Sequence, residues 1–167
     1  FVGDDSVVEG GTGTMKKDSA DISIPEDTLV SVVMATYRRD QALRNALTSL
    51  AAQTYQNFQV VLVDDNDDGE WTAKVQAIVD EFKDQISIHY IVNEHNMGSA
   101  ATRNRGIAEA KGQYITFLDD DDVYLPPKIE MQLKDIISSG ADYGITDLYL
   151  YNENGELIDR RIRTYIK

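Results

Sequence analysis

Short runs of apolar, often β-branched residues alternate along this chain with longer segments of helical periodicity. The apolar runs are typical of buried strands. They occupy residues 30–35, 58–63, 86–92 and 113–118. Between them, apolar side chains recur at helical spacing, which predicts a helix in each gap. These helices are expected at about 40–51, 70–82 and 99–110.

The predicted elements follow one another in the order β-α-β-α-β-α-β. This order predicts an α/β fold with a mainly parallel central sheet and helices on both faces. Asp40 is suited to cap the first helix. Gly112 is suited to end the third helix.

The region after the fourth strand predicts a helix and a hairpin. Pro126 and Pro127 favour the start of a helix. A strand is expected at 143–151, and Asn154-Gly155 predicts a tight turn into a second strand at 156–163.

Residues 1–28 differ from the rest because they are rich in glycine and polar residues and lack periodicity. The stretch Gly10-Gly11-Thr12-Gly13 does not form a phosphate-binding loop, since no Gly-Lys-Ser/Thr follows it. We therefore divide the chain into a flexible extension or linker at 1–28 and one domain at 29–167.

Composition narrows the classes of partner. The chain has 167 residues and a net charge of −13, which argues against nucleic acid or an anionic membrane as the main partner. It has no cysteine, which excludes disulfides, zinc–thiolate sites and thiol nucleophiles. No apolar run reaches the length of a membrane span. We expect a cytoplasmic location, with any membrane association supplied by segments outside this sequence.

Polar clusters follow three of the predicted strands, at residues 36–39, 64–66 and 119–122. In a parallel sheet these strand ends meet at one rim, where ligands of open α/β folds bind. The third cluster is four consecutive aspartates, whose charges raise one another's pKa. A hard cation such as Mg²⁺ or Mn²⁺ would remove that cost. A solvated acidic turn remains the alternative for this cluster, and capping or surface charge for the other two.

Several segments together resemble the family-2 glycosyltransferases, the nucleotide-sugar enzymes with the Rossmann-like GT-A fold. The resemblance covers about Thr28 to Ser139. The matching segments come in the family's order: Val32 to Arg39, Ser49 to Tyr55, Val63 to Asn66, Asn96 to Gly98, Ala101 to Ile107, and Gly112 to Asp122.

The resemblance implies a nucleotide-binding site at the strand ends. Ala35, Thr36 and Tyr37 match the segment that packs against the base. Asp65 matches the aspartate that hydrogen-bonds uracil, and its carboxylate would accept from a ring N–H. Arg103 matches an arginine near the donor phosphates or sugar.

The resemblance also implies a metal site, because Asp119-Asp120-Asp121 matches the family's Asp-x-Asp element. Asp121 is then the strongest candidate ligand for Mn²⁺ or Mg²⁺, and Asp119 is the next. Asp119 and Asp120 are also expected among the nucleotide-binding residues. The donor would be a UDP-sugar or another nucleoside-diphosphate sugar.

The implied reaction is inverting transfer of the sugar to an acceptor hydroxyl, as in bacterial polysaccharide or cell-envelope glycan synthesis. Such transfer needs a carboxylate base, and the catalytic base is unknown here. The acids after the aspartate run, Asp147, Glu153, Glu156 and Asp159, have no recognisable context, and Asp142 and Asp147 suit a structural role.

We therefore expect the base outside this chain, an incomplete acceptor-binding segment, and little or no transfer by the chain alone. Two alternatives remain. One is a sugar-phosphate nucleotidyltransferase-like enzyme, although the glycine-rich loop of that class is missing after the first strand. The other is a non-catalytic acidic metal-binding module.

Overall fold

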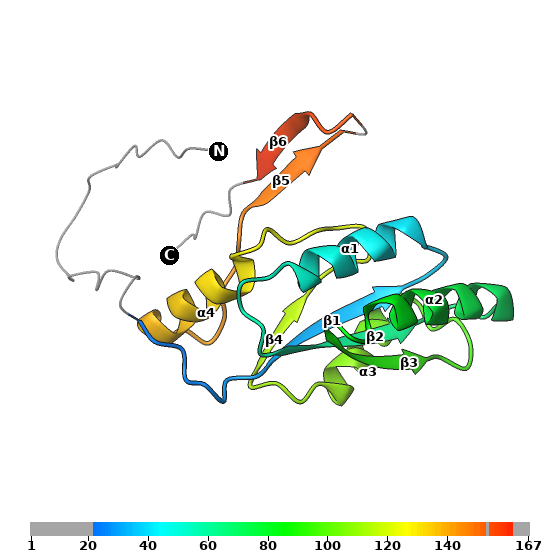
Figure 1. Cartoon of the computed structure of the whole chain (residues 1–167), viewed down its shortest axis with the longest axis horizontal. Helices are drawn as coiled ribbons and strands as arrows, with labels where there is room; N and C mark the ends of the chain where they lie inside the picture. Colours follow the sequence, from blue (N-terminus) through cyan, green and yellow to red (C-terminus); the bar gives the residue numbers. More distant parts are fainter. Residues whose placement is uncertain (1–21, 153, 162–167) are drawn as a thin grey trace.

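The computed structural model describes residues 22–152 and 154–161, and the whole chain is drawn in Figure 1. Ten helices and strands lie in these ranges. In chain order they are β1 (Val30–Thr36), α1 (Gln41–Ala51), β2 (Phe58–Asp64), α2 (Gly69–Phe82), β3 (Ser87–Val92), α3 (Ser99–Glu109), β4 (Tyr114–Phe117), α4 (Lys128–Ser139), β5 (Leu148–Tyr151) and β6 (Leu157–Arg161).

The central sheet has four parallel strands in the order β3-β2-β1-β4. The predicted alternation of strands and helices is therefore confirmed, as is the parallel sheet. The register pairs Thr36 at the end of β1 with Asp64 at the end of β2. Because both strands end at the same level, the polar residues after them share one rim of the sheet.

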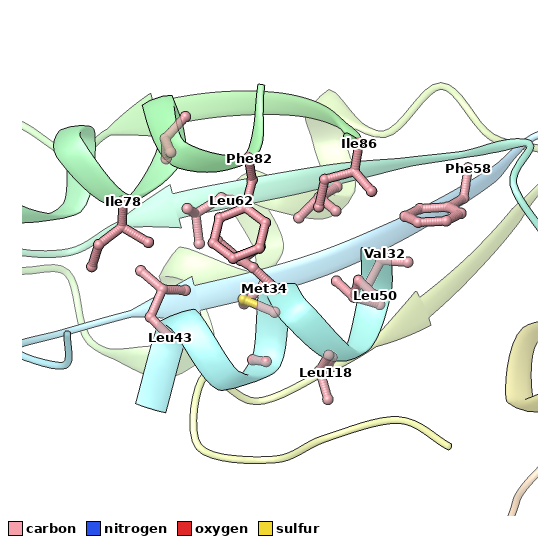
Figure 2. Close-up of a cluster of buried hydrophobic side chains, with 14 of the residues drawn as sticks. Val32, Met34, Leu43, Leu50, Phe58, Leu62, Ile78, Phe82, Ile86 and Leu118 are labelled. Atoms are coloured by element: carbon pink, nitrogen blue, oxygen red, sulfur yellow. The ribbon is translucent and has the colours of Figure 1, made fainter. Parts of the chain in front are cut away.

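Helices cover both faces of the sheet, with α1 and α2 on one side and α3 on the other (Figure 1). The larger core joins Val32, Met34 and Leu62 of the sheet to buried side chains of α1 and α2, among them Leu43 and Phe82 (Figure 2). Each fully buried side chain of this kind stabilises the fold by about 1.5–3 kcal/mol. These apolar positions are the periodic ones in the sequence, which is why the prediction of α1 and its strands succeeds.

On the opposite face, α3 packs closely on the sheet through a glycine. A Cβ built on Gly106 would lie 2.6 Å from Cγ1 of Val33 and 3.3 Å from Cγ2 of Val63. The absence of a side chain at this position lets the helix backbone approach the strands. This close approach sets the position of the α3 N-terminus at the rim.

The two predicted cap residues have different outcomes. The Asp40 side chain accepts a hydrogen bond from the Gln41 N–H at 2.6 Å, as expected for the N-cap of α1. The role assigned to Gly112 is wrong, because α3 ends at Ala110 in extended backbone. Gly112 instead lies against β1, where an added Cβ would be 2.6 Å from Ser31 N and 2.7 Å from Leu29 O.

The region after the acidic run forms α4 and the predicted antiparallel hairpin of β5 and β6. The predicted strand at 143–151 is shorter in the structure, since only Leu148–Tyr151 is extended and paired. Much of the hairpin is exposed, and it projects away from the four-stranded sheet (Figure 1). The helix α4 is followed by Gly140 in left-handed backbone at φ 64°, a conformation that favours glycine at a helix end.

The predicted extension at 1–28 lies mostly outside the described residues. Within its described part, Ile24 packs against the larger core and Thr28 is buried. Among residues 22–152 and 154–161, no helix is both long and apolar enough to cross a membrane. The division into an extension and a single domain stays a prediction.

Candidate functional site

A cavity of about 530 Å³ lies at the carboxyl ends of the strands, between the loops after β1, β2 and β4 and the start of α3. Its size falls within the range of small-molecule sites. Its position is that of ligand sites in open α/β sheets. The lining residues are Ala35, Thr36, Tyr37, Arg39, Asp65, Asn96, Gly98, Ser99, Thr102, Arg103, Asp119, Asp120 and Asp121.

Every residue that the sequence assigned to the nucleotide or the metal lines this cavity. These are Ala35, Thr36, Tyr37, Asp65, Arg103, Asp119, Asp120 and Asp121. The fold therefore brings together side chains that are more than 80 positions apart in the chain, such as Thr36 and Asp120. Their individual roles remain predictions, since the cavity shows only that they share one site.

Asp65 is buried, and its carboxylate is held by three donors. Its Oδ1 accepts from the Asn93 side chain at 2.6 Å and from the Met97 N–H at 2.8 Å. Its Oδ2 accepts from the Gly98 N–H at 2.9 Å. Burial alone would raise the pKa of Asp65, but these hydrogen bonds outweigh burial and lower it. Asp65 therefore fixes the loop that leads into α3, in addition to facing the cavity.

The neighbouring Asp64 has a structural role that sequence reasoning missed. It is fully buried, and its Oδ1 accepts from both the backbone and the side chain of Asn66. Its Oδ2 accepts from the Tyr90 hydroxyl at 2.6 Å. Asn66 in turn accepts from the Arg38 N–H at 2.9 Å, which supports the left-handed backbone of Arg38 at φ 51°. The network thus fixes the loops after β1 and β2 relative to each other.

The acidic run has one inward carboxylate, Asp120, and three exposed ones. Asp120 is buried and accepts from the Thr36 hydroxyl at 2.8 Å, so it ties the run to the end of β1. Burial raises the pKa of Asp120, against the opposing effects of Thr36 and Arg39. Asp119 and Asp121 are exposed and line the cavity.

Two arginines form ion pairs with three of the four aspartates of the run. Arg39 lies with Nε 3.4 Å from Asp120 Oδ1 and with Nη1 3.0 Å from Asp121 Oδ2. Arg103, from α3, pairs with Asp119 Oδ1. Arg103 was expected near the donor phosphates. Arg39 was expected in the rim cluster at 36–39, with surface charge as the alternative, and it was not assigned to the nucleotide or the metal.

The exit of the acidic run is held by polar contacts of the half-buried Tyr124 and Lys128, which the sequence did not indicate. The Tyr124 hydroxyl donates to the Phe117 carbonyl at 2.6 Å, and its N–H donates to Ser49 Oγ at 3.0 Å. The Lys128 ammonium lies 3.7 Å from the centre of the Tyr124 ring and donates to Thr116 Oγ1 at 2.8 Å. Burial lowers the pKa of Lys128 to about 7.

Gln53, at the end of α1, closes the same segment. Its amide nitrogen donates to the Leu125 carbonyl at 2.9 Å, and its amide oxygen accepts from the Ile129 N–H at 3.2 Å. These bonds join α1 to the start of α4 across the end of the acidic loop. The loop that carries Asp119 and Asp121 is therefore anchored on both sides.

Within the described ranges, no three His, Asp or Glu side chains converge as a ready metal site. This does not conflict with the chemistry of the run. Mg²⁺ is commonly held by one or two carboxylates, with the rest supplied by substrate phosphates and water. Asp119 and Asp121 therefore fit a cation whose coordination is completed by a diphosphate.

Three of the four acids considered as a base lie in the described ranges, and they do not line the cavity. These three are Asp147, Glu156 and Asp159. Asp147 pairs with Arg160 at 3.2 Å, in keeping with a structural role. Glu153 lies outside the described residues.

The fold and the cavity together define an α/β domain that binds its ligand at the carboxyl ends of its strands, beside an acidic loop and a helix N-terminus. Residues 31–167 match the model of glycosyl transferase family 2, and the chain belongs to this family. The predicted family resemblance is therefore confirmed.

Relatives of known name and structure agree with this assignment. An Escherichia coli protein named as a UDP-Glc:α-D-GlcNAc-diphosphoundecaprenol β-1,3-glucosyltransferase is 30% identical over 145 residues, which cover 85% of this chain and 55% of that protein. Staphylococcus aureus TarS 1–349, solved with UDP-GlcNAc, is 26% identical with a TM-score of 0.62, over 68% of this chain and 32% of that one. A Pyrobaculum calidifontis mannosyltransferase, solved with GDP-Man and Mn²⁺, shares the fold at 19% identity and a TM-score of 0.56, over 74% of this chain and 35% of that one.

The chain spans only part of the length of its relatives. It covers 55% of the E. coli protein and 45% of a glycosyltransferase from Methanocaldococcus jannaschii that is 35% identical over 133 residues. Residues 31–167, which match the family model, contain the residues of the strand-end cavity and the acidic run.

Proposed function

We propose that this domain binds a nucleoside-diphosphate sugar, with UDP-sugars favoured, through Mn²⁺ or Mg²⁺ at the acidic run. In its full-length protein it would supply the donor for inverting transfer of the sugar to an acceptor hydroxyl. One observation carries the proposal: the cavity at the strand ends brings Tyr37, Asp65, Arg103 and the acidic run together around a space of ligand size.

Each part of the cavity suits one part of the donor. The exposed Tyr37 offers a ring face for a base, and Asp65 offers a carboxylate for a ring N–H. The N-terminus of α3 has no side-chain cap and reaches the cavity at Gly98 and Ser99, so its dipole favours a phosphate there. Arg103 adds a positive charge on the same wall.

Asp121 and Asp119 are the residues that would hold the cation. When bound, the cation neutralises the negative charge that develops on the leaving diphosphate. Thr36 and the Tyr37 N–H keep Asp120 turned inward, with Oδ2 at 2.8 Å and 3.4 Å from them. Asp119 and Asp121 on either side of Asp120 are thereby presented to the cavity.

The relatives support a uridine nucleotide as the donor's carrier. The E. coli relative is named for UDP-Glc, and TarS was solved with UDP-GlcNAc. The name of the E. coli relative also includes a diphosphoundecaprenol acceptor, so a lipid-linked glycan of a bacterial cell envelope is the acceptor class that we favour. The acids that line the cavity, Asp65, Asp119, Asp120 and Asp121, are all engaged in holding the loops or facing the arginines. Among the described residues no other acid lines the cavity, and we propose that the general base lies outside this chain.

Calorimetry of UDP binding with Mn²⁺ and with EDTA tests the proposal. We expect binding that depends on Mn²⁺ and falls at least about tenfold in Asp121→Ala, because a charge-assisted ligand contact is lost. Asp122→Ala is the matched control, since Asp122 belongs to the same run but does not line the cavity. Calcium binding without any effect of nucleotide would instead support a non-catalytic metal-binding module.

Two further measurements bear on the donor and on turnover. Thermal-shift screening of UDP-, GDP- and dTDP-sugars with Mn²⁺ should select the donor, with the largest shift for a UDP-sugar. The isolated chain should show little or no sugar transfer. Robust turnover by the chain alone would refute the placement of the base.

A further inference from the structure

Arg39 belongs to the polar cluster predicted at the rim, residues 36–39, but was given no role in the site, and its contacts suggest one. It follows β1, lines the cavity, and is about half exposed. Its guanidinium bridges the buried Asp120, at 3.4 Å, and the outward Asp121, at 3.0 Å. It therefore lies on the same carboxylate that we propose as the principal cation ligand.

A guanidinium and a divalent cation compete for such a carboxylate. The positive charges repel each other strongly at contact distances. An oxygen paired with Arg39 has to exchange this partner for the cation. The exchange is feasible because a half-exposed ion pair of this kind holds its partners only weakly.

We infer that Arg39 is an internal counter-ion that holds Asp121 in the donor-free protein and is displaced when the cation binds. The inference rests on the proposed function, since the cation is the one that accompanies the diphosphate. The contact to Asp120 gives Arg39 a second carboxylate on which to remain. Because Asp120 is fixed to Thr36, the guanidinium can release Asp121 without leaving the cavity.

The role explains why four adjacent carboxylates do not disrupt the loop without a ligand. Arg39 compensates Asp120 and Asp121, and Arg103 compensates Asp119. Burial and the charges of Asp121 and Asp119 raise the pKa of the remaining Asp122. It also follows that the free protein binds a metal ion weakly until the competing arginine moves.

The test is the affinity for Mn²⁺ in the absence of nucleotide. Electron paramagnetic resonance measures it through the signal of the unbound ion. Arg39→Gln should bind Mn²⁺ roughly three- to tenfold more tightly than the wild type, because the cation no longer has to break the ion pairs of Arg39. Arg38→Gln is the matched control, because it also removes one positive charge beside the cavity. Unlike Arg39, Arg38 contacts Asp67, at 4.0 Å, and the Tyr37 ring rather than the acidic run. Arg39→Lys should remain close to the wild type.

A double variant separates direct competition from a general effect of charge. With Asp121→Asn already present, Arg39→Gln should no longer raise the Mn²⁺ affinity, because the shared carboxylate is gone. Equal affinities of wild type and Arg39→Gln, no measurable Mn²⁺ binding by either, or a gain that persists without Asp121 would overturn the inference. Nucleotide is absent from every arm, so a failure of Mn²⁺-dependent UDP binding would refute the proposed function separately.

Discussion

Replacement of Asp65 by asparagine should destabilise the domain strongly even without any ligand. The buried carboxylate accepts three hydrogen bonds, two at Oδ1 and one at Oδ2. Asparagine keeps one oxygen, which can face Asn93 and Met97. Its NH₂ group then meets the Gly98 N–H, so two donors oppose each other in a buried place.

The expected loss follows from these contacts. A hydrogen bond to a charged group contributes about 1.5–3 kcal/mol, and the other two bonds weaken when the charge is removed. We expect Asp65→Asn to lower the free energy of unfolding by about 2–4 kcal/mol. For a chain of this size that corresponds to a fall in Tm of about 4–16 °C.

Thermal and urea unfolding at pH 7 in EDTA measure this loss. Because hydrogen bonds lower the pKa of Asp65 in the folded state, their contribution is fully present above the unfolded pKa. It is lost as the pH falls through the lower folded pKa, so the difference between wild type and variant should shrink below about pH 4. Asp67→Asn is the control, because Asp67 is about half exposed and its ion pair with Arg38 is long, at 4.0 Å.

The control should change stability by less than about 0.5 kcal/mol. If Asp65→Asn were no more destabilising than Asp67→Asn, the three hydrogen bonds would not hold the loop. Asp65 would then serve the nucleotide alone. A strong loss of stability means instead that UDP binding by this variant must be compared at a temperature where both proteins are folded.

Three other substitutions test the supports of the site. Gly112→Ala should cost about 1–3 kcal/mol in urea unfolding, since its Cβ would meet the backbone of β1 at 2.6 Å, whereas Gly69→Ala, with open space around it, should be neutral or stabilising. Gln53→Leu should cost about 2–4 kcal/mol in the same assay, because it removes the acceptor of the Ile129 N–H and the side-chain donor to the Ser49 and Leu125 carbonyls. Gln76→Leu on the exposed face of α2 should cost much less. Lys128→Met should flatten the pH dependence of stability. Because burial lowers the pKa of Lys128 to about 7, the folded wild type binds fewer protons than the unfolded chain between about pH 7 and 10, so its stability rises with pH there by up to about 1.4 kcal/mol per unit.

The sequence was sufficient for the elements whose burial is periodic. Leu43, Ala46, Leu47 and Leu50 recur at helical spacing, and all four are buried in α1. The continuous apolar runs of β1 and β2 are buried on both faces, as parallel strands require. Because strand ends in such a sheet share a rim, the cavity position followed from the order of elements alone.

Other features depend on contacts between segments that no local pattern encodes. Gly112 looks like a helix end in the sequence, but its role comes from the approach of β1, about 80 residues earlier in the chain. Gln53 looks like a polar residue after an amphipathic helix, yet it is buried because the start of α4 covers it. In both cases the deciding partner belongs to another element.

The arginines at the acidic run depend both on the local charge pattern and on contacts between distant segments. The crowded charges alone predict that some cation must be present, and a metal ion is the cation that the family resemblance implies. The structure adds that Arg39, after β1, pairs with Asp120 and Asp121, and that Arg103, on α3, pairs with Asp119. A diphosphate with its metal ion brings nearly equal amounts of both charges. When it binds, the carboxylates can exchange the arginines for the metal ion, and the arginines can pair with the diphosphate, so little net charge is added to the site. A chain of net charge −13 can bind an anionic donor in this way.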